Sequence, residues 1–146
     1  MITSDFSNIP FVIVFVFIMP TCDSEQVKLS AGYFKRLKDD YSKQIEESGL
    51  RNISEKELAL LYNNRGHSMY MQVEFDSAMD DYNKALEYDP MLAVALYNRG
   101  TVQYRMGNFE AALEDMEKAL SLDSCNAEII DGFNECKRIL GEKRCR

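Results

Sequence analysis

Large apolar side chains recur at helical spacing through the second half of the chain. The recurring residues stand three, four or seven positions apart within each segment: Phe75, Tyr82, Leu86, Phe109, Met116 and Leu120. This spacing places them on one face of a helix, so the pattern predicts amphipathic helices that bury a common stripe. Prolines stand only at positions 10, 20 and 90, which leaves room for long uninterrupted helices.

The pattern repeats with a period of 34 residues. Shifting the sequence by this offset pairs identical residues at twelve positions, from Ala59 with Ala93 to Asp89 with Asp123. A fixed period of this length is typical of a stack of similar supersecondary units. The chain is therefore predicted to be a helical repeat array.

Each unit is predicted to contain two helices. In the second unit they cover 93–106 and 109–121, with a turn at 107–108, where a glycine precedes an asparagine. The first unit repeats this arrangement over 59–88. Gly66 and its counterpart in the second unit lie inside a helix, where glycine costs about 1 kcal/mol relative to alanine, so we expect a close helix approach there.

Helix starts are also marked. Ser54 followed by Glu57 forms a capping-box pattern ahead of the first unit. Asp89 before Pro90 predicts a capping carboxylate and a proline in the first helical turn of the second unit.

These segments are similar to a known family. The spans YNNRG, EFDSAMDDYNKALEYDP, YNRG and GNFEAALEDMEKALSLD resemble tetratricopeptide (TPR) repeats. The resemblance implies an all-α fold, a short TPR solenoid of antiparallel helix-turn-helix repeats that coils into a right-handed superhelix with a concave binding face. It implies no catalysis. The two clear repeats are placed at 57–90 and 91–124.

The frame continues less clearly on both sides. Residues 125–146 are predicted to form a capping helix, over 127–140 and ending at Gly141, and a basic tail. Residues 23–56 are interpreted as a degenerate first repeat, because Phe34 aligns with Phe75 at an offset of 41. The longer offset predicts an inserted loop around 47–53, and little room remains for a first helix after Pro20.

An apolar run covers residues 11–19 within the N-terminal segment 1–22. It is about half the length that a transmembrane helix needs. A signal-peptide core fits the length, but Asp5 precedes it and no Lys or Arg does. The alternatives are a segment docked on the helices or a segment that does not belong to the working protein.

Composition excludes several functions. The net charge of −7 opposes binding to a nucleic-acid backbone, and no segment predicts a membrane span. The four cysteines lack zinc-site spacing and are interpreted as reduced thiols, which favours a cytoplasmic protein over a secreted one. With one histidine and no catalytic motif, the chain is predicted to be no enzyme, with no metal and no cofactor.

Two arginines suggest structural ion pairs. Arg65 and Arg99 are each followed sixteen residues later by an aspartate, Asp81 and Asp115. The two antiparallel helices of a hairpin bring such positions together, and arginine is suited to a bidentate pair with a carboxylate. We therefore favour ion pairs within each repeat over ligand-binding arginines.

The resemblance implies that first helices line the binding groove. From 59 to 126 every acid falls outside these helices, which predicts a groove that is uncharged to mildly positive and an acidic convex back. Helical spacing proposes these groove residues: Asn63, His67, Tyr70, Met71, Tyr97, Asn98, Thr101, Tyr104 and Arg105. Their amides and tyrosines are suited to a peptide backbone, although Tyr70 and Tyr104 have the alternative role of closing the hairpins.

The predicted function is to bind a neutral or acidic segment of another protein in this groove. The alternative is a structural subunit whose groove is filled by its own N-terminal segment or by a second copy. TPR domains that grip acidic chaperone tails use lysine, asparagine and arginine as a carboxylate clamp. Of the five aligned positions only Asn98 matches, and Glu128 and Gly132 stand where cations are needed, so this clamp is disfavoured.

Overall fold

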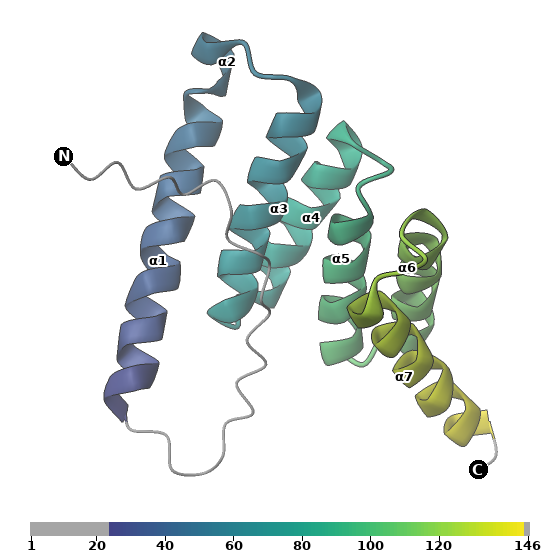
Figure 1. Cartoon of the computed structure of the whole chain (residues 1–146). Helices are drawn as coiled ribbons and strands as arrows, with labels where there is room; N and C mark the ends of the chain where they lie inside the picture. The colour runs from purple at the N-terminus through teal and green to yellow at the C-terminus, as the bar shows by residue number, and fades with distance from the viewer. Residues whose placement is uncertain (1–23, 145–146) are drawn as a thin grey trace.

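The computed structural model describes residues 24–144, with side chains placed from 30 to 142, and all regular structure in this range is helical. The helices are α1 (Ser24–Glu46), α2 (Ser48–Arg51), α3 (Glu55–Met71), α4 (Phe75–Tyr88), α5 (Ala93–Arg105), α6 (Phe109–Leu122) and α7 (Ala127–Arg144). The predicted all-α solenoid is confirmed (Figure 1). The apolar run at 11–19 lies outside the described residues.

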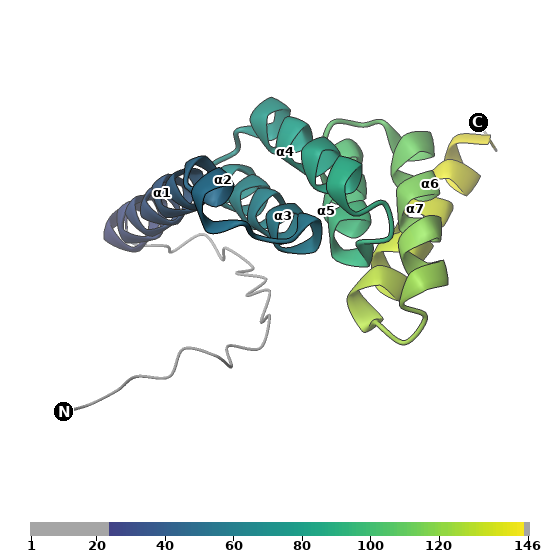
Figure 2. The same cartoon turned by 90° about the horizontal axis from the view of Figure 1, so that it is seen from above.

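The helices stack as two hairpins between single helices. α3 pairs with α4 and α5 pairs with α6, while α1 packs against α3 at one end and α7 against α6 at the other. The first helices of the hairpins are neighbours, since α5 contacts both α3 and α7. In Figure 2, α4 lies above α3 and α5. The array therefore has one surface formed by α3, α5 and α7.

Close helix approach explains the two glycines inside helices. A Cβ on Gly66 would lie 3.1 Å from the Asp81 Cβ, and a Cβ on Gly100 would lie 3.1 Å from the Ala112 carbonyl oxygen. Both distances are tighter than ordinary van der Waals contact, so each hairpin closes because no side chain stands at the crossing. The packing reason expected for these glycines is confirmed.

The apolar stripe forms the core between the two layers. Tyr82, Ala78 and Val102 are buried together in one cluster. Met116 and Cys136 join α6 to α7 in another. Because the same faces of α4 and α6 are buried in both repeats, the predicted stripe is confirmed.

One predicted cap is present and the other is not. The Ser54 side chain accepts a hydrogen bond from the Glu57 N–H, and Glu57 accepts from the Ser54 N–H, so α3 begins at Glu55. The capping role expected of Asp89, with Pro90 in the first helical turn, is wrong. Asp89 accepts from the Met91 N–H at 3.0 Å within a turn, and α5 begins only at Ala93. Asp89 thus stabilises the connecting turn. Pro90 lies in this turn, where its fixed φ is suited, and not in the helix that follows.

The N-terminal flank is one long helix. Residues from Ser24 to Glu46 form α1, so the stretch before Phe34 continues this helix and makes no separate first helix. Within 47–53, where a loop was expected, the chain forms the single-turn helix α2. Asn52 follows in the left-handed conformation and ends it.

The C-terminal helix is longer than predicted. α7 passes through Gly141 and continues to Arg144, so the expected end at this glycine is wrong. A Cβ there would meet nothing within 4 Å, so no packing constraint acts on it. Arg138 pairs with Glu142 one turn later at 2.6 Å, which supports the helix across the glycine. No helix within residues 24–144 has the length and apolar character needed to cross a membrane.

Candidate functional site

A groove lies on the surface formed by α3, α5 and α7. Its volume is about 540 Å³. The lining residues lie mainly on α3, α5 and α7, with one residue each from α4 and α6: His67, Tyr70, Met71, Tyr82, Tyr97, Asn98, Thr101, Tyr104, Arg105, Met116, Glu128, Asp131, Gly132 and Glu135. A smaller hollow of about 330 Å³ adjoins it towards the start of α7 and shares Tyr97 and Asn98. We refer to the larger hollow as the groove.

Tyrosine rings form much of its wall. Tyr70 packs against Phe75 with ring centroids 5.8 Å apart, and Tyr104 packs edge-on against Phe109 at 5.3 Å. Each tyrosine thus closes its hairpin at the first residue of the second helix and also faces the groove. The hairpin-closing role is therefore observed, and a role of these tyrosines in binding stays a prediction.

Tyr97 and Tyr104 connect the wall to acidic side chains of α7. Burial, together with the nearby Glu128 carboxylate, raises the pKa of Tyr97. The Tyr104 hydroxyl donates to Glu135 Oε1 at 3.3 Å, and slight burial with this carboxylate raises its pKa. Both phenols therefore remain neutral donors at physiological pH.

His67 lies where the groove meets α1. Its ring contacts Phe34 with centroids 6.5 Å apart and Tyr70 at 6.3 Å. Burial among these rings lowers the pKa of His67. The imidazole is consequently neutral at pH 7 and adds no positive charge to the groove.

The two predicted amides differ in accessibility. Asn98 lines the groove and donates through Nδ2 to the Asn63 Oδ1 at 3.0 Å. Asn63 is only 1% exposed and also bonds to Asn64. The assignment of Asn63 to the groove surface is therefore wrong, because its amide is used to join α3 to α5. It holds the Asn98 amide in place.

Three further predicted residues stand along the groove. The Thr101 hydroxyl donates to the Tyr97 carbonyl oxygen at 2.9 Å, as is common for threonine inside a helix. Met71 is 42% exposed at the end of α3. Arg105 is exposed at the end of α5 and forms no ion pair within the part of the chain whose side chains are placed. These residues offer a hydroxyl oxygen that can accept a hydrogen bond, a flexible apolar surface and a cation.

The charge predicted for the groove is wrong. α7 brings Glu128, Asp131 and Glu135 to its wall, opposite the single cation Arg105. Arg138 lowers the pKa of Glu135 through a direct hydrogen bond at 2.6 Å, so that carboxylate is ionised and already paired. With a neutral histidine, the groove carries net negative charge along α7.

A signal for these acids was present in the sequence. Moving from Tyr97 and Thr101 by the repeat period of 34 leads to Asp131 and Glu135. The groove charge predicted from residues 59–126 leaves out α7, which begins at Ala127. The 34-residue period, applied to this next helix, places its carboxylates in the groove.

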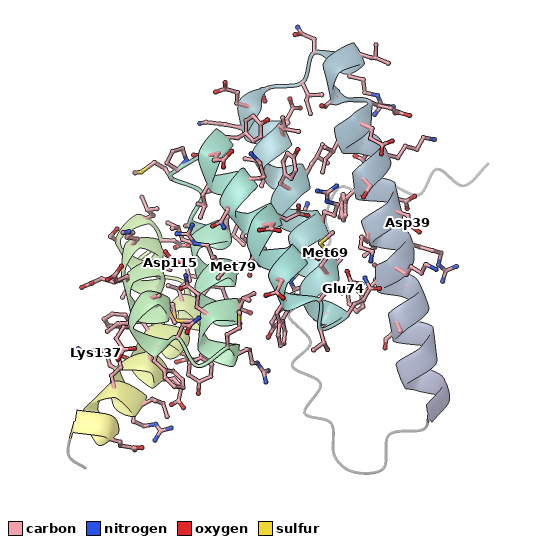
Figure 3. All side chains as sticks on the ribbon, turned by 180° about the vertical axis from the view of Figure 1, so that it is seen from behind. Asp39, Met69, Glu74, Met79, Asp115 and Lys137 are labelled. Carbon is pink, nitrogen blue, oxygen red and sulfur yellow. The ribbon has the colours of Figure 1, made fainter. Side chains whose placement is uncertain are left out.

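The paired arginines lie apart from the groove. Arg65 donates to both Asp81 carboxylate oxygens at 2.7 Å, and Arg99 does the same to Asp115. The aspartate side chains are 6% and 4% exposed, so each arginine neutralises a nearly buried carboxylate. Hydrogen bonds to the respective aspartate raise the pKa of both guanidinium groups. Neither arginine is among the residues that line the groove. Asp115, the partner of Arg99, is labelled on α6 in Figure 3.

The described side chains gather no metal site. From 30 to 142, no group of three His, Cys, Asp or Glu side chains is close enough to share an ion. Cys125 and Cys136 are unpaired thiols, the first exposed and the second buried. What the groove offers is aromatic surface, amide and hydroxyl groups, and charge, the set that recognises a polypeptide segment.

Family models match the segment from α4 to α6. A TPR repeat model covers residues 74–107, and a tetratricopeptide repeat model covers residues 93–124.

Solved structures share the fold. The second TPR domain of human RPAP3 in complex with the HSP70 peptide SGPTIEEVD is 23% identical, with a TM-score of 0.63 over 77% of this chain and 90% of that one. The first TPR of Spaghetti (RPAP3) bound to the HSP90 peptide SRMEEVD is 20% identical, with a TM-score of 0.59 over 82% and 96%. The Sgt2 TPR domain from Aspergillus fumigatus is 19% identical, with a TM-score of 0.61 over 84% and 82%.

At these identities the similar structures indicate the fold alone, and the family models indicate the repeats. Residues 74–124 therefore match tetratricopeptide repeat models, and the described chain has the fold of an all-α TPR solenoid.

Proposed function

We propose that this chain is a non-catalytic adaptor that holds a segment of another protein in the groove. The observation that carries the proposal is the groove itself, whose wall combines tyrosines with an anchored amide and an exposed methionine. Aromatic and thioether surfaces bury apolar side chains, while the Asn98 amide and the Thr101 hydroxyl are suited to a peptide backbone. The similar RPAP3 domains are peptide complexes, which supports this use of the surface.

The charge along α7 defines the segment further. Glu128 and Asp131 are exposed and, among the residues with placed side chains, form no ion pair. An acidic segment would meet repulsion from these carboxylates, whereas a Lys, Arg or N–H donor would be attracted. We therefore revise the expectation of a neutral or acidic segment. The groove favours an apolar segment that is neutral or that carries a cation opposite α7.

The same charges disfavour the acidic tails that the RPAP3 neighbours bind. The peptides SGPTIEEVD and SRMEEVD each end in several carboxylates. In the groove of this chain the cation is Arg105 alone, with Glu128 where a clamp needs positive charge. We propose that such tails bind weakly or not at all by this route.

Site-specific photocrosslinking tests the proposal. A photoreactive amino acid replaces Met71, which is exposed in the groove wall, or Glu117, which is exposed on the opposite face, in the full chain expressed in cells. Crosslinked peptides are then sequenced by mass spectrometry. We expect the Met71 position to crosslink a defined segment of another protein and the Glu117 position to give none.

Each other outcome is informative. Crosslinks from position 117 alone would place the partner on the convex face and contradict the groove proposal. Crosslinks from position 71 to residues 1–23 of the same chain, or to a second copy, would instead establish the alternative of a subunit whose groove is filled.

A further inference from the structure

α1 stands where the second helix of a repeat stands. Arg99 of α5 donates to Asn83 on the preceding α4 at 2.9 Å, in addition to its own aspartate. Arg65 of α3 makes the corresponding contact to Ser42 on α1 at 3.4 Å. Ser42 is thus the structural counterpart of Asn83, 41 residues earlier. By the same offset Asp40 is the counterpart of Asp81.

The counterpart residues differ sharply in burial. On α4, Asp81 and Tyr82 are 4% and 1% exposed because α3 covers them. On α1, Asp40 is exposed and Tyr41 only partly buried. Tyr33, one position before Phe34, is 53% exposed. The face of α1 that would receive a first helix is therefore open in the described structure.

The aspartate on this face lacks its arginine. Asp81 and Asp115 each accept two hydrogen bonds from an arginine of their own first helix. Asp40 forms no hydrogen bond or ion pair with any side chain placed between 30 and 142. Residues 24–33 cannot provide the helix, because they extend α1 itself.

The preceding sequence does not provide the cation either. Residues 1–23 contain no Lys, Arg or His. Residues 1–23 therefore cannot present an arginine to Asp40.

We propose that the open face of α1, formed by Tyr33, Leu37, Asp40 and Tyr41, docks a helix of another protein that presents an arginine to Asp40. Leu37 stands at the position of Ala78, so the crossing has less room than in the hairpins. A glycine next to the docked arginine, as in the Arg65–Gly66 pair, keeps the docked helix as close to α1 as the Leu37 side chain allows. The docking completes the first repeat in trans and is separate from the groove.

A tethered helix tests the chemistry of this face. The probe is a second copy of residues 53–74, which contains an arginine followed by glycine, joined to the N-terminus of the full chain by a flexible Gly/Ser linker. Such a linker provides a high effective concentration, so a helix that is weakly stable alone can dock. We expect the tether to raise the Tm by about 3 °C or more.

The matched variants identify the ion pair. Asp40→Asn, or replacement of the tethered arginine by methionine, should each remove most of the rise, and the two together should remove no more. Asp39→Asn, which changes a neighbouring exposed acid, should leave the rise intact.

Four results would overturn the proposal. The first is no rise in Tm with the tether, and the second is a rise that is indifferent to Asp40→Asn. A Tm of the untethered chain that falls with Asp40→Asn at all protein concentrations would show that the chain itself already covers this face. A Tm that depends on protein concentration, with the dependence lost in Asp40→Asn, would identify a second copy as the occupant.

Discussion

Gly100 shows how a single position sets the spacing of a hairpin. A Cβ there would lie 3.1 Å from both the Ala112 carbonyl oxygen and the Met116 Cγ. Backbone cannot move aside without separating the helices, so a side chain at this point acts on the whole hairpin. Gly141 is a helical glycine without this constraint, because a Cβ there meets nothing within 4 Å.

We therefore predict that Gly100→Leu lowers the free energy of unfolding by about 1–3 kcal/mol or more. Gly141→Leu is the control, and it should be neutral or slightly stabilising because glycine is the poorer helix former. Urea denaturation followed by circular dichroism measures both. Equal stability of the Gly100 variant and the wild type would contradict the closeness of the α5–α6 crossing.

His67 is the second residue whose environment predicts a measurable effect. Burial lowers its pKa in the folded state below the ordinary value near 6.5. As the pH falls through that value, the unfolded chain takes up a proton more readily than the folded one. Stability linked to His67 is therefore full above about pH 6.5 and is lost below it.

Since His67 is the single histidine, its contribution can be isolated. We predict that the free energy of unfolding is lower at pH 5.5 than at pH 7.5, with a slope for this one group of at most ~1.4 kcal/mol per pH unit. His67→Gln should reduce the difference between the two pH values. If the variant and the wild type show the same pH dependence, the histidine is not buried in its neutral form.

At the scale of elements, each hairpin is joined by a bidentate ion pair across its two helices. Asp115 on α6 is nearly buried, and Arg99 on α5 is 23% exposed in its side chain. Removing the arginine leaves a carboxylate without its partner in a place where water reaches it poorly, which is costly. The pair therefore fixes the register of α5 against α6.

We predict that Arg99→Leu and Asp115→Ala couple in a double-mutant cycle by ~0.5–3 kcal/mol. The exposed pair of Arg138 and Glu142 within α7 is the control, and its coupling should lie near zero to ~0.5 kcal/mol. Arg99→Leu should leave crosslinking from position 71 unchanged. Loss of that crosslink in a folded variant, with no coupling to Asp115, would make Arg99 a ligand-binding residue.

The ends of the elements were the least predictable from local sequence. The helices of the second repeat begin and end within one residue of expectation, because the Gly107 turn and the apolar stripe mark both sides. The helix-start role predicted for Pro90 and the helix end predicted at Gly141 are wrong. A proline can stand in the turn before a helix, and an exposed glycine can lie within one. The neighbouring contacts of Asp89 and Arg138 decide these cases.

At the scale of the whole molecule, stacking places α7 beside α5 and so determines the charge of the groove. Asp131 then faces the same hollow as Arg105, although 26 residues separate them in the sequence. A segment bound there would meet both signs of charge, with negative charge in excess. The sign of the groove is a property of the array and belongs to no single repeat.

We predict that Asp131→Lys weakens binding of the crosslinked segment several-fold, with a smaller loss at high salt because the charges are exposed. Glu110→Lys, an equivalent change at an exposed acid of α6, is the control and should have little effect. The peptide SRMEEVD should not compete for the groove. If Arg105→Glu abolishes binding while Asp131→Lys strengthens it, the segment is acidic and the charge argument fails.

The repeat, its helices and the residues that touch within each hairpin could all be predicted from the order of residues. The period of 34 identifies Gly66 with Gly100 and Arg65 with Arg99, and helical spacing decides which side chains share a face. These are relations between residues near each other along the chain, where the geometry of a helix and a short turn leaves few alternatives.

Contacts between repeats, by contrast, became apparent from the packing of the helices. Asn63 has the spacing of a groove residue, yet the stacking of α3 on α5 buries it against Asn98. The same stacking brings the acids of α7 into the groove and leaves Asp40 of α1 without an arginine. Such contacts depend on how successive hairpins rotate and pack, which the order of residues within one repeat does not specify.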